Sequence, residues 1–302
     1  MNTLPVSLYD AFTDVAFGGS QAAVVTGARD LCPAVRQRIA KELGLPATAF
    51  VDEIRGNRIA VQFFSTVMEL PMCGHGTVCM VTHCLENGLL PRDLFECVLE
   101  LPAGQATVEI SSASQRPEIM LDVTPAILES VSLDLQQLAG LLGISATSIS
   151  REHPVSVARG DFIHLVVPVV SLEQMSAMDP DFSGIVTFCK AYGFETVVAF
   201  SRQASRPDRD LHVRDFCPAV GVPESAGAGT TNAALACYLL KHGLVESNGK
   251  GVVGIFAEQG MEVGRTSTVH SVIYLDREAD SRIARLQVGG VATRILAGEL
   301  TI

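Results

Sequence analysis

Two short glycine turns of the same form, set about half the chain apart, most constrain the fold of this 302-residue sequence. The first is Cys73-Gly74-His75-Gly76-Thr77 and the second is Ala226-Gly227-Ala228-Gly229-Thr230. Each turn leads into an apolar run, residues 78–85 or 231–240, that is followed within three residues by a glycine. Apolar runs of this length with a glycine stop predict helices that are buried nearly all round. The pair therefore predicts duplicated halves, each with one central helix.

Many short strand-like segments surround these two helices, and helices do not alternate regularly with strands. That pattern argues against a doubly wound sheet. We therefore predict an α+β fold with two pseudo-symmetric domains, each a β-barrel-like sheet wrapped around its central apolar helix. The predicted boundary lies near Pro125, so that residues 1–125 form the first domain and residues 126–289 the second. The C-terminal strand, residues 290–302, is expected to return to the first domain.

The amino-acid composition and charge of the chain exclude several classes of protein. Hydrophobic residues make up 48% of the chain and charged residues 18%, which supports large buried cores. The net charge of −11 argues against a nucleic-acid surface, and no apolar stretch is long enough to span a membrane. The N-terminus lacks the pattern of a signal peptide, so a soluble, cytoplasmic protein is expected. Eight cysteines are scattered without paired spacing, which predicts reduced, buried thiols and no metal site.

The first glycine turn carries the candidate chemistry. A strand that enters a glycine turn and then a helix places backbone N–H groups and the positive end of the helix dipole at one point, which suits a carboxylate. Cys73 lies at that point, and a thiol near a helix N-terminus has a lowered pKa and can act as a base. His75 is expected to orient the substrate or to carry the proton onward. The competing interpretation is a glycine turn with an inert buried cysteine and a packing histidine.

Further segments carry a known pattern in a fixed order: Asp10-Ala11-Phe12-Thr13, Gly19-Ser20-Gln21-Ala22-Ala23-Val24-Val25, Glu69-Leu70-Pro71-Met72-Cys73-Gly74-His75, Arg214-Asp215-Phe216-Cys217-Pro218, Gly221-Val222-Pro223-Glu224, and Gln259-Gly260 with Gly264-Arg265. In these segments the sequence resembles the PhzF family of phenazine-biosynthesis proteins, within the superfamily of diaminopimelate epimerases and proline racemases. Residues 72–76 are also similar to the first catalytic turn of proline racemases. The resemblance implies two barrel domains with the active site between them, proton transfer next to a carboxylate without a cofactor, and a homodimer.

The sequence departs from the family at three positions that matter for catalysis. Ala47 replaces the glutamate that acts as acid and base in PhzF-type enzymes, and Ser225 replaces the family's aspartate. Ala226 stands where racemases have their second cysteine. Neither the phenazine mechanism nor a two-cysteine racemisation therefore transfers intact to this chain.

The remaining groups favour a cofactor-independent isomerase that moves a proton along one face of a small carboxylate substrate. Cys73 is the predicted base and His75 its catalytic partner, with no metal. The predicted substrate-binding residues are Gly74, Gly76, Thr77, Ser225, Gly227, Ala228, Gly229, Thr230, Asp10 and Ser20. Other interpretations of these residues stay open: a racemase or epimerase, a dehydratase, or a ligand-binding protein without catalysis. Asp215 is expected to be a solvated charge.

Overall fold

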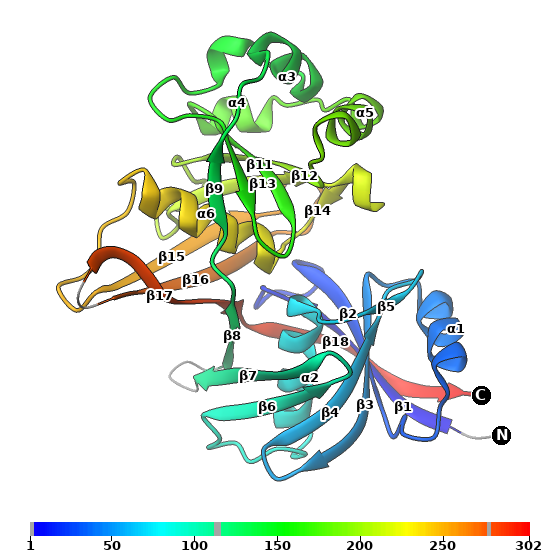
Figure 1. The fold of residues 1–302 in the computed structure, drawn as a ribbon. Helices are drawn as coiled ribbons and strands as arrows, with labels where there is room; N and C mark the ends of the chain where they lie inside the picture. The colour runs from blue at the N-terminus through cyan, green and yellow to red at the C-terminus, as the bar shows by residue number, and fades with distance from the viewer. Residues whose placement is uncertain (1–2, 112–115, 277–278) are drawn as a thin grey trace. The chain divides into compact units, whose positions relative to one another are not determined.

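The computed structural model describes residues 3–111, 116–276 and 279–302. The chain divides into two compact units (Figure 1). The first unit comprises Met1–Asp122 with Gly289–Ile302, and the second comprises Val123–Val288. Each unit combines a sheet with helices and has one central apolar helix, so the predicted α+β fold with two similar domains is confirmed.

The first unit is built on one mixed sheet. Its strands are β1 (Thr3–Ala11), β2 (Ser20–Thr26), β3 (Ala47–Arg55), β4 (Arg58–Phe64), β5 (Glu69–Leu70), β6 (Glu96–Leu101), β7 (Gly104–Ser111), β8 (Glu118–Val123) and β18 (Ala292–Thr301). Backbone pairing gives the order β18–β1–β2–β3–β4–β6–β7–β8, with β5 also paired to β4. The C-terminal strand therefore closes one edge of this sheet against β1.

Two helices complete the part of the first unit that the structure describes. Helix α1 (Pro33–Leu43) connects the parallel strands β2 and β3, and helix α2 (Gly74–Glu86) connects the parallel strands β4 and β6. Every residue of α2 from Gly76 to Leu85 is buried, and the helix contacts β1, β2, β3 and β18. Its apolar sequence is therefore explained, because no face of the helix is left to solvent.

The second unit also contains mixed β-sheet. Its strands are β9 (Ile127–Ser130), β10 (Ser156–Arg159), β11 (Ile163–Pro168), β12 (Thr196–Ser201), β13 (Leu211–Phe216), β14 (Glu224–Ser225), β15 (Val252–Gln259), β16 (Ser267–Asp276) and β17 (Ala279–Gly290). The order of the paired strands is β9–β10–β11–β12–β13–β15–β16, with β14 also paired to β13.

Within its described residues, the second unit also holds three α-helices besides its central one, α6 (Gly229–Lys241). These are α3 (Leu135–Leu142), α4 (Leu172–Ser176) and α5 (Phe182–Tyr192), and two short 3₁₀ turns occupy Ala146–Ser148 and Pro218–Val220. Helix α5 was not predicted from the sequence, although both of its ends are capped. The Asp181 side chain accepts a hydrogen bond from Gly184 N at 2.9 Å in the first turn, and Gly193 ends the helix with φ 72°. Helices α3 and α5 supply much of the apolar core on one side of this sheet.

The duplicated halves share one local arrangement. In each unit a strand, a two-residue antiparallel strand, a 13-residue helix and a second parallel strand follow one another: β4-β5-α2-β6 and β13-β14-α6-β15. The sequence analysis aligned the two glycine turns with Cys73 opposite Ala226, and the helix caps correct this alignment. Cys73 caps α2 and Ala228 caps α6, so Cys73 corresponds to Ala228 and not to Ala226.

His212 forms a buried ionic cluster in the second unit. Its Nδ1 lies 2.8 Å from Glu258 Oε1 and its Nε2 lies 2.9 Å from Glu262 Oε1, and the His212 side chain is 1% exposed. Ser205 donates to both oxygens of Glu258, from its backbone N–H at 2.6 Å and its hydroxyl at 2.7 Å. Burial alone would lower the pKa of His212, but the hydrogen bonds to the two glutamates outweigh it and raise the pKa to about 9.

This cluster predicts a loss of stability at alkaline pH. The folded pKa of His212 lies above the ordinary value near 6.5, so its contribution is complete below pH 6.5 and is lost as the pH rises through 9. We expect the free energy of unfolding to fall by roughly 3 kcal/mol more in the wild type than in His212→Gln between pH 6.5 and 10. Urea denaturation at several pH values checks this, and parallel pH curves for the two proteins would contradict it.

Candidate active site

The start of α2 brings Cys73 and His75 together in the first unit. Cys73 is the N-cap residue in an extended conformation, with φ −145° and ψ 107°, and α2 begins at Gly74. The Cys73 Sγ atom lies 3.6 Å from Nδ1 and 3.8 Å from Nε2 of His75. The thiol and the imidazole are therefore in direct contact at the end of the helix where backbone N–H groups are left without helical partners.

Both groups are uncharged in the resting protein. Burial raises the pKa of the Cys73 thiol to about 12, against the opposing effect of the Gly76 backbone N–H. Burial also lowers the pKa of His75 to about 4, although this residue keeps part of its surface exposed. The expected thiolate is therefore wrong for the resting state, because loss of water around the sulfur outweighs the helix dipole.

Two glycines of the first turn of α2 differ in their surroundings. A Cβ atom on Gly76 would lie 3.1 Å from Cys73 Sγ and 3.1 Å from the ring of Phe63, whereas a Cβ on Gly74 would meet nothing within 4 Å. Gly76 thus lets the thiol pack against the aromatic ring, and Gly74 borders open space. Thr77, the next residue, is fully buried.

These surroundings predict different effects of alanine at the two glycines. Both replacements put alanine in place of glycine in the helix, so their difference isolates the contact with Cys73 and Phe63. We expect Gly76→Ala to be less stable than Gly74→Ala by roughly 1–3 kcal/mol, as overpacked cores are. Urea denaturation of the two variants checks this, and equal stabilities would show that the sulfur and ring move aside without cost.

Asp10 and Ser20 lie on β1 and β2 of the same unit and are both buried. An Asp10 oxygen accepts a hydrogen bond from the backbone N–H of Phe17 at 2.8 Å, across a turn in which Phe12 and Phe17 adopt positive φ of 64° and 69°. The pKa of Cys79, one turn into α2, is raised by burial and further by Cys73 and Asp10. Asp10 is therefore close to the first turns of α2, and the hydrogen bond that it accepts from Phe17 holds the β1–β2 turn.

The predicted residues of the second turn lie around the start of α6 in the second unit. Ser225 ends β14, and Ala228, the N-cap residue, precedes Gly229 at the start of the helix. Gln259 of β15 holds this turn, because its side chain donates to Ser225 O at 3.1 Å and accepts from Ala228 N at 3.4 Å. The predicted site residues thus form two groups, one at each central helix.

Asp215 is a polar residue that the sequence interpretation placed wrongly. It lies on β13 and is 2% exposed, so it is not a solvated charge. Its Oδ2 accepts a hydrogen bond from the Thr231 hydroxyl of α6 at 2.7 Å. Its burial follows from the central position of β13 between β12 and β15, which covers both faces of the strand and which the sequence alone does not show.

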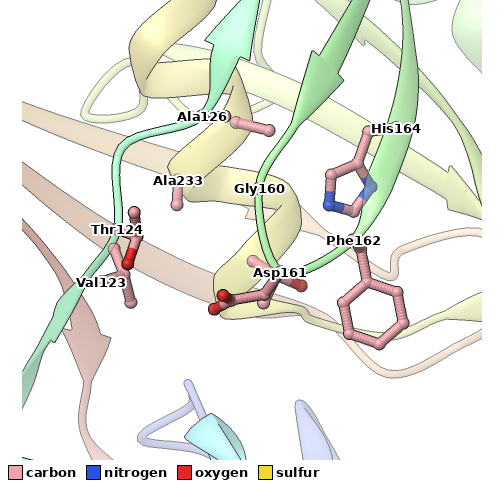
Figure 2. A pocket seen from close by; sticks show the side chains of 10 residues that line it. Val123, Thr124, Ala126, Gly160, Asp161, Phe162, His164 and Ala233 are labelled. Atoms are coloured by element: carbon pink, nitrogen blue, oxygen red, sulfur yellow. The ribbon is translucent and has the colours of Figure 1, made fainter.

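A small cavity in the second unit borders the same helix. Its lining includes Thr230 of α6. Figure 2 shows Ala233 of the same helix, Asp161 from the turn before β11, and His164 on β11 around the cavity. His164 Nδ1 lies 2.7 Å from the Thr196 hydroxyl, while its Nε2 has no hydrogen-bond partner among the described residues. The volume of about 10 Å³ is close to that needed for one water molecule, and burial lowers the pKa of His164 to about 4.

The described residues offer no grouping of three or more histidine, cysteine, aspartate or glutamate side chains suited to a metal ion. All eight cysteines are free; seven are buried, and Cys32 is exposed, contrary to the expectation that it is buried. In the described parts of the chain, no helix has the length and apolar character that a membrane span requires.

Comparison with known proteins identifies the family. The model of the phenazine biosynthesis-like protein family, PhzC-PhzF, matches residues 9–298. The trans-2,3-dihydro-3-hydroxyanthranilate isomerase of Pseudomonas fluorescens is 29% identical over 94% of each chain, and the uncharacterized isomerase YfhB of Bacillus subtilis is 27% identical over 89% of this chain and 90% of its own. The crystal structure of a Bacillus anthracis phenazine biosynthesis protein of the PhzF family matches with a TM-score of 0.90, at 24% identity and with all of both chains covered. The chain therefore belongs to the phenazine biosynthesis-like (PhzC-PhzF) family and is an isomerase of that family.

Proposed function

We propose that this isomerase moves a proton on a small carboxylate substrate without a cofactor, with Cys73 as the main base. The observation that carries the proposal is the contact of 3.6 Å between Cys73 Sγ and His75 Nδ1 at the start of α2. Backbone N–H groups at a helix start bind anions, so the substrate carboxylate has a place beside the thiol. A Cβ atom on Gly74 would meet nothing within 4 Å, so the space beside this first residue of the helix is open.

The mechanism starts from the neutral pair. His75 accepts the Cys73 proton, and the sulfur then takes the proton from the substrate carbon next to the carboxylate. The enolate-like intermediate carries negative charge, which the helix-start N–H groups stabilise; loss of one such donor costs about 2.7–4 kcal/mol in measured enzymes. Return of a proton to a different carbon completes the double-bond shift. Proton transfer of this kind by a positioned side chain contributes about 10²–10⁴-fold to the rate.

The second turn bears on which reaction is catalysed. Ala228 corresponds to Cys73 in the repeat, so no second cysteine stands at the start of α6. Inversion of a stereocentre needs a base on one face and an acid on the other, which favours a hydrogen shift over a two-cysteine racemase or epimerase. A dehydratase also needs one strong base and remains an alternative proposal.

Loss of catalysis in favour of ligand binding is the second candidate. Ala47 starts β3, is fully buried and supplies no acidic group. The raised pKa of Cys73, about 12, also works against a base in the resting protein. This candidate predicts binding of a carboxylate without proton exchange. The homodimer and the cytoplasmic location remain predictions.

Solvent deuterium exchange tests the proposal. The wild-type protein in D₂O is incubated with trans-2,3-dihydro-3-hydroxyanthranilate, the compound named for the Pseudomonas fluorescens relative, and with a panel of cyclic and linear amino and hydroxy acids. Label in recovered substrate or product supports proton transfer. Chiral analysis detects a racemase, and ultraviolet absorbance of an unsaturated product detects a dehydratase. Tight binding of a panel compound without any label would sink the catalytic proposal and favour the binding protein.

A further inference from the structure

The side chain of His164 borders the small cavity beside α6 and has one nitrogen to offer a ligand. His164 lies on β11, is 2% exposed and is one of the residues that line the cavity. Its Nδ1 lies 2.7 Å from the Thr196 hydroxyl, and its Nε2 has no hydrogen-bond partner among the described residues. Figure 2 shows one ring nitrogen of His164 on the side of Gly160 and Asp161, which also line the cavity. Buried polar atoms are nearly always hydrogen-bonded, so this nitrogen points to a ligand.

The neighbours of His164 determine whether its Nε2 donates or accepts a hydrogen bond. Burial raises the pKa of Asp215 to about 6, against hydrogen bonds from the hydroxyls of Thr231 and Thr196, so Asp215 is ionised at pH 7 and above. The single hydroxyl proton of Thr196 is therefore given to Asp215, and the Thr196 oxygen accepts the proton of His164 Nδ1. Burial lowers the pKa of His164 to about 4, so the ring is neutral. A neutral ring with its proton on Nδ1 has an Nε2 that can only accept.

The other polar side chains of the cavity can also accept hydrogen bonds. The polar side chains among its described lining residues are Thr124, Asp161, His164 and Thr230, and the same lining contains no lysine or arginine. Asp161 is exposed, so its carboxylate lies at the rim and gives the lining a negative charge. The lining therefore suits a group that donates several hydrogen bonds and carries a positive charge.

The size of the cavity limits the bound group to one heavy atom with its hydrogens. Its volume of about 10 Å³ is close to that needed for one water molecule. An ammonium group has about the size of water, whereas a carboxylate, a phosphate or a trimethylated ammonium group is larger. The backbone N–H groups at the start of α6 would by themselves favour an anion, but Thr230 of that first turn shares the cavity with the carboxylate of Asp161. A primary ammonium group thus fits both the volume and the acceptors.

We propose that this cavity of the second unit is a binding site for the ammonium group of a small primary amine. One N–H of the group donates to His164 Nε2, and the others donate to the Asp161 carboxylate and the Thr230 hydroxyl. Thr196 is a positioning residue, because its hydroxyl keeps the imidazole proton on Nδ1 and so keeps Nε2 free to accept. All of these residues belong to Val123–Val288, so the inference uses no residue of the first unit and does not depend on the proposed function.

The test titrates methylammonium chloride into the full chain with isotope-labelled histidine and follows the ring signals of His164 by NMR. These signals are identified by their loss in His164→Gln or, if that variant does not fold, by nuclear Overhauser effects to Thr196. We expect a saturable shift with methylammonium and none with equal concentrations of tetramethylammonium chloride or sodium acetate. Asp161→Asn should weaken binding about 10-fold, as loss of one charged hydrogen bond does. Asp134→Asn, an exposed helix cap in the same unit, is the matched control and should bind like the wild type.

Replacement of Thr196 tests its positioning role. Thr196→Val keeps the shape of the side chain but removes the hydroxyl, so we expect several-fold weaker methylammonium binding and a second tautomer of His164 in nitrogen NMR spectra. Thr196→Ser should restore both. A proton on His164 Nε2 in the wild type would overturn the inference, because the cavity would then present a donor. So would a wild type without a saturable methylammonium shift, an equal shift with sodium acetate, or unchanged affinity in Asp161→Asn. Since these measurements need no catalysis, a failure of the proposed function would not alter them.

Discussion

Replacement of Cys73 by alanine is expected to lower the rate of proton exchange by about 10²–10⁴-fold, the usual contribution of a positioned acid–base group. The sulfur is the group at the start of α2 that touches His75, and alanine removes it without adding bulk. Cys73→Ser keeps a hydroxyl of similar size but should be nearly as slow, because a serine hydroxyl is a far weaker acid than a thiol. Deuterium incorporation followed by NMR measures all of these rates.

Cys189→Ala is the matched control. Cys189 is also a buried thiol, but it lies on α5, in the apolar core that α3 and α5 build in the second unit. Its removal leaves a comparable small cavity, so any general effect of deleting a buried sulfur appears there too. If Cys73→Ala keeps wild-type exchange while His75→Asn loses it, the base is His75 and the assignment of Cys73 is wrong.

The fold could be predicted from the sequence because the strongest sequence signals for its helices are local. Each central helix is indicated by three local signals: a glycine turn before it, an unbroken apolar run, and a glycine after the last turn. The closing glycines are Gly88 and Gly243. Helix α5 was not predicted, although its caps are equally clear in the sequence. Its apolar residues cover only one side of the helix and therefore do not form a continuous apolar run. The sequence analysis also aligned the two turns with an error of two residues. Both turns contain Gly-x-Gly-Thr, but α2 begins at the first glycine of its turn and α6 at the second.

The site could be predicted only in part from the sequence, because the burial of a side chain is a property of the tertiary structure. Sequence placed Cys73 at a helix start and so predicted a lowered pKa, but the surrounding side chains exclude water and raise it to about 12. Asp215 lies in a strand with His212 and Arg214, which reads as a polar, solvent-facing segment. In the fold those three side chains are buried, and each has a partner on another element.

The buried ion pair between Arg214 and Glu224 should be the most sensitive polar contact of the second unit. Arg214 donates to both carboxylate oxygens, from Nε at 2.9 Å and from a terminal nitrogen at 2.8 Å, and also to the backbone oxygens of Met175 and Met178. The two side chains are 5% and 3% exposed. Breaking a buried pair by removing one partner costs about 3–5 kcal/mol, because the other charge stays buried without compensation. We therefore expect Arg214→Met to lose that much stability in urea denaturation.

Two further variants distinguish this explanation from a general effect of losing an arginine. Arg58→Met breaks the pair between Arg58 and Glu100 in the first unit, which is as short, at 2.6 Å, but is 40% and 41% exposed. It should cost no more than about 1 kcal/mol, because water screens exposed pairs. The double variant Arg214→Met with Glu224→Leu removes both buried charges and should recover part of the lost stability, as apolar replacements of buried ion pairs do. Equal losses for Arg214→Met and Arg58→Met would show that Glu224 finds another partner or water once Arg214 is gone, and that burial does not set the cost.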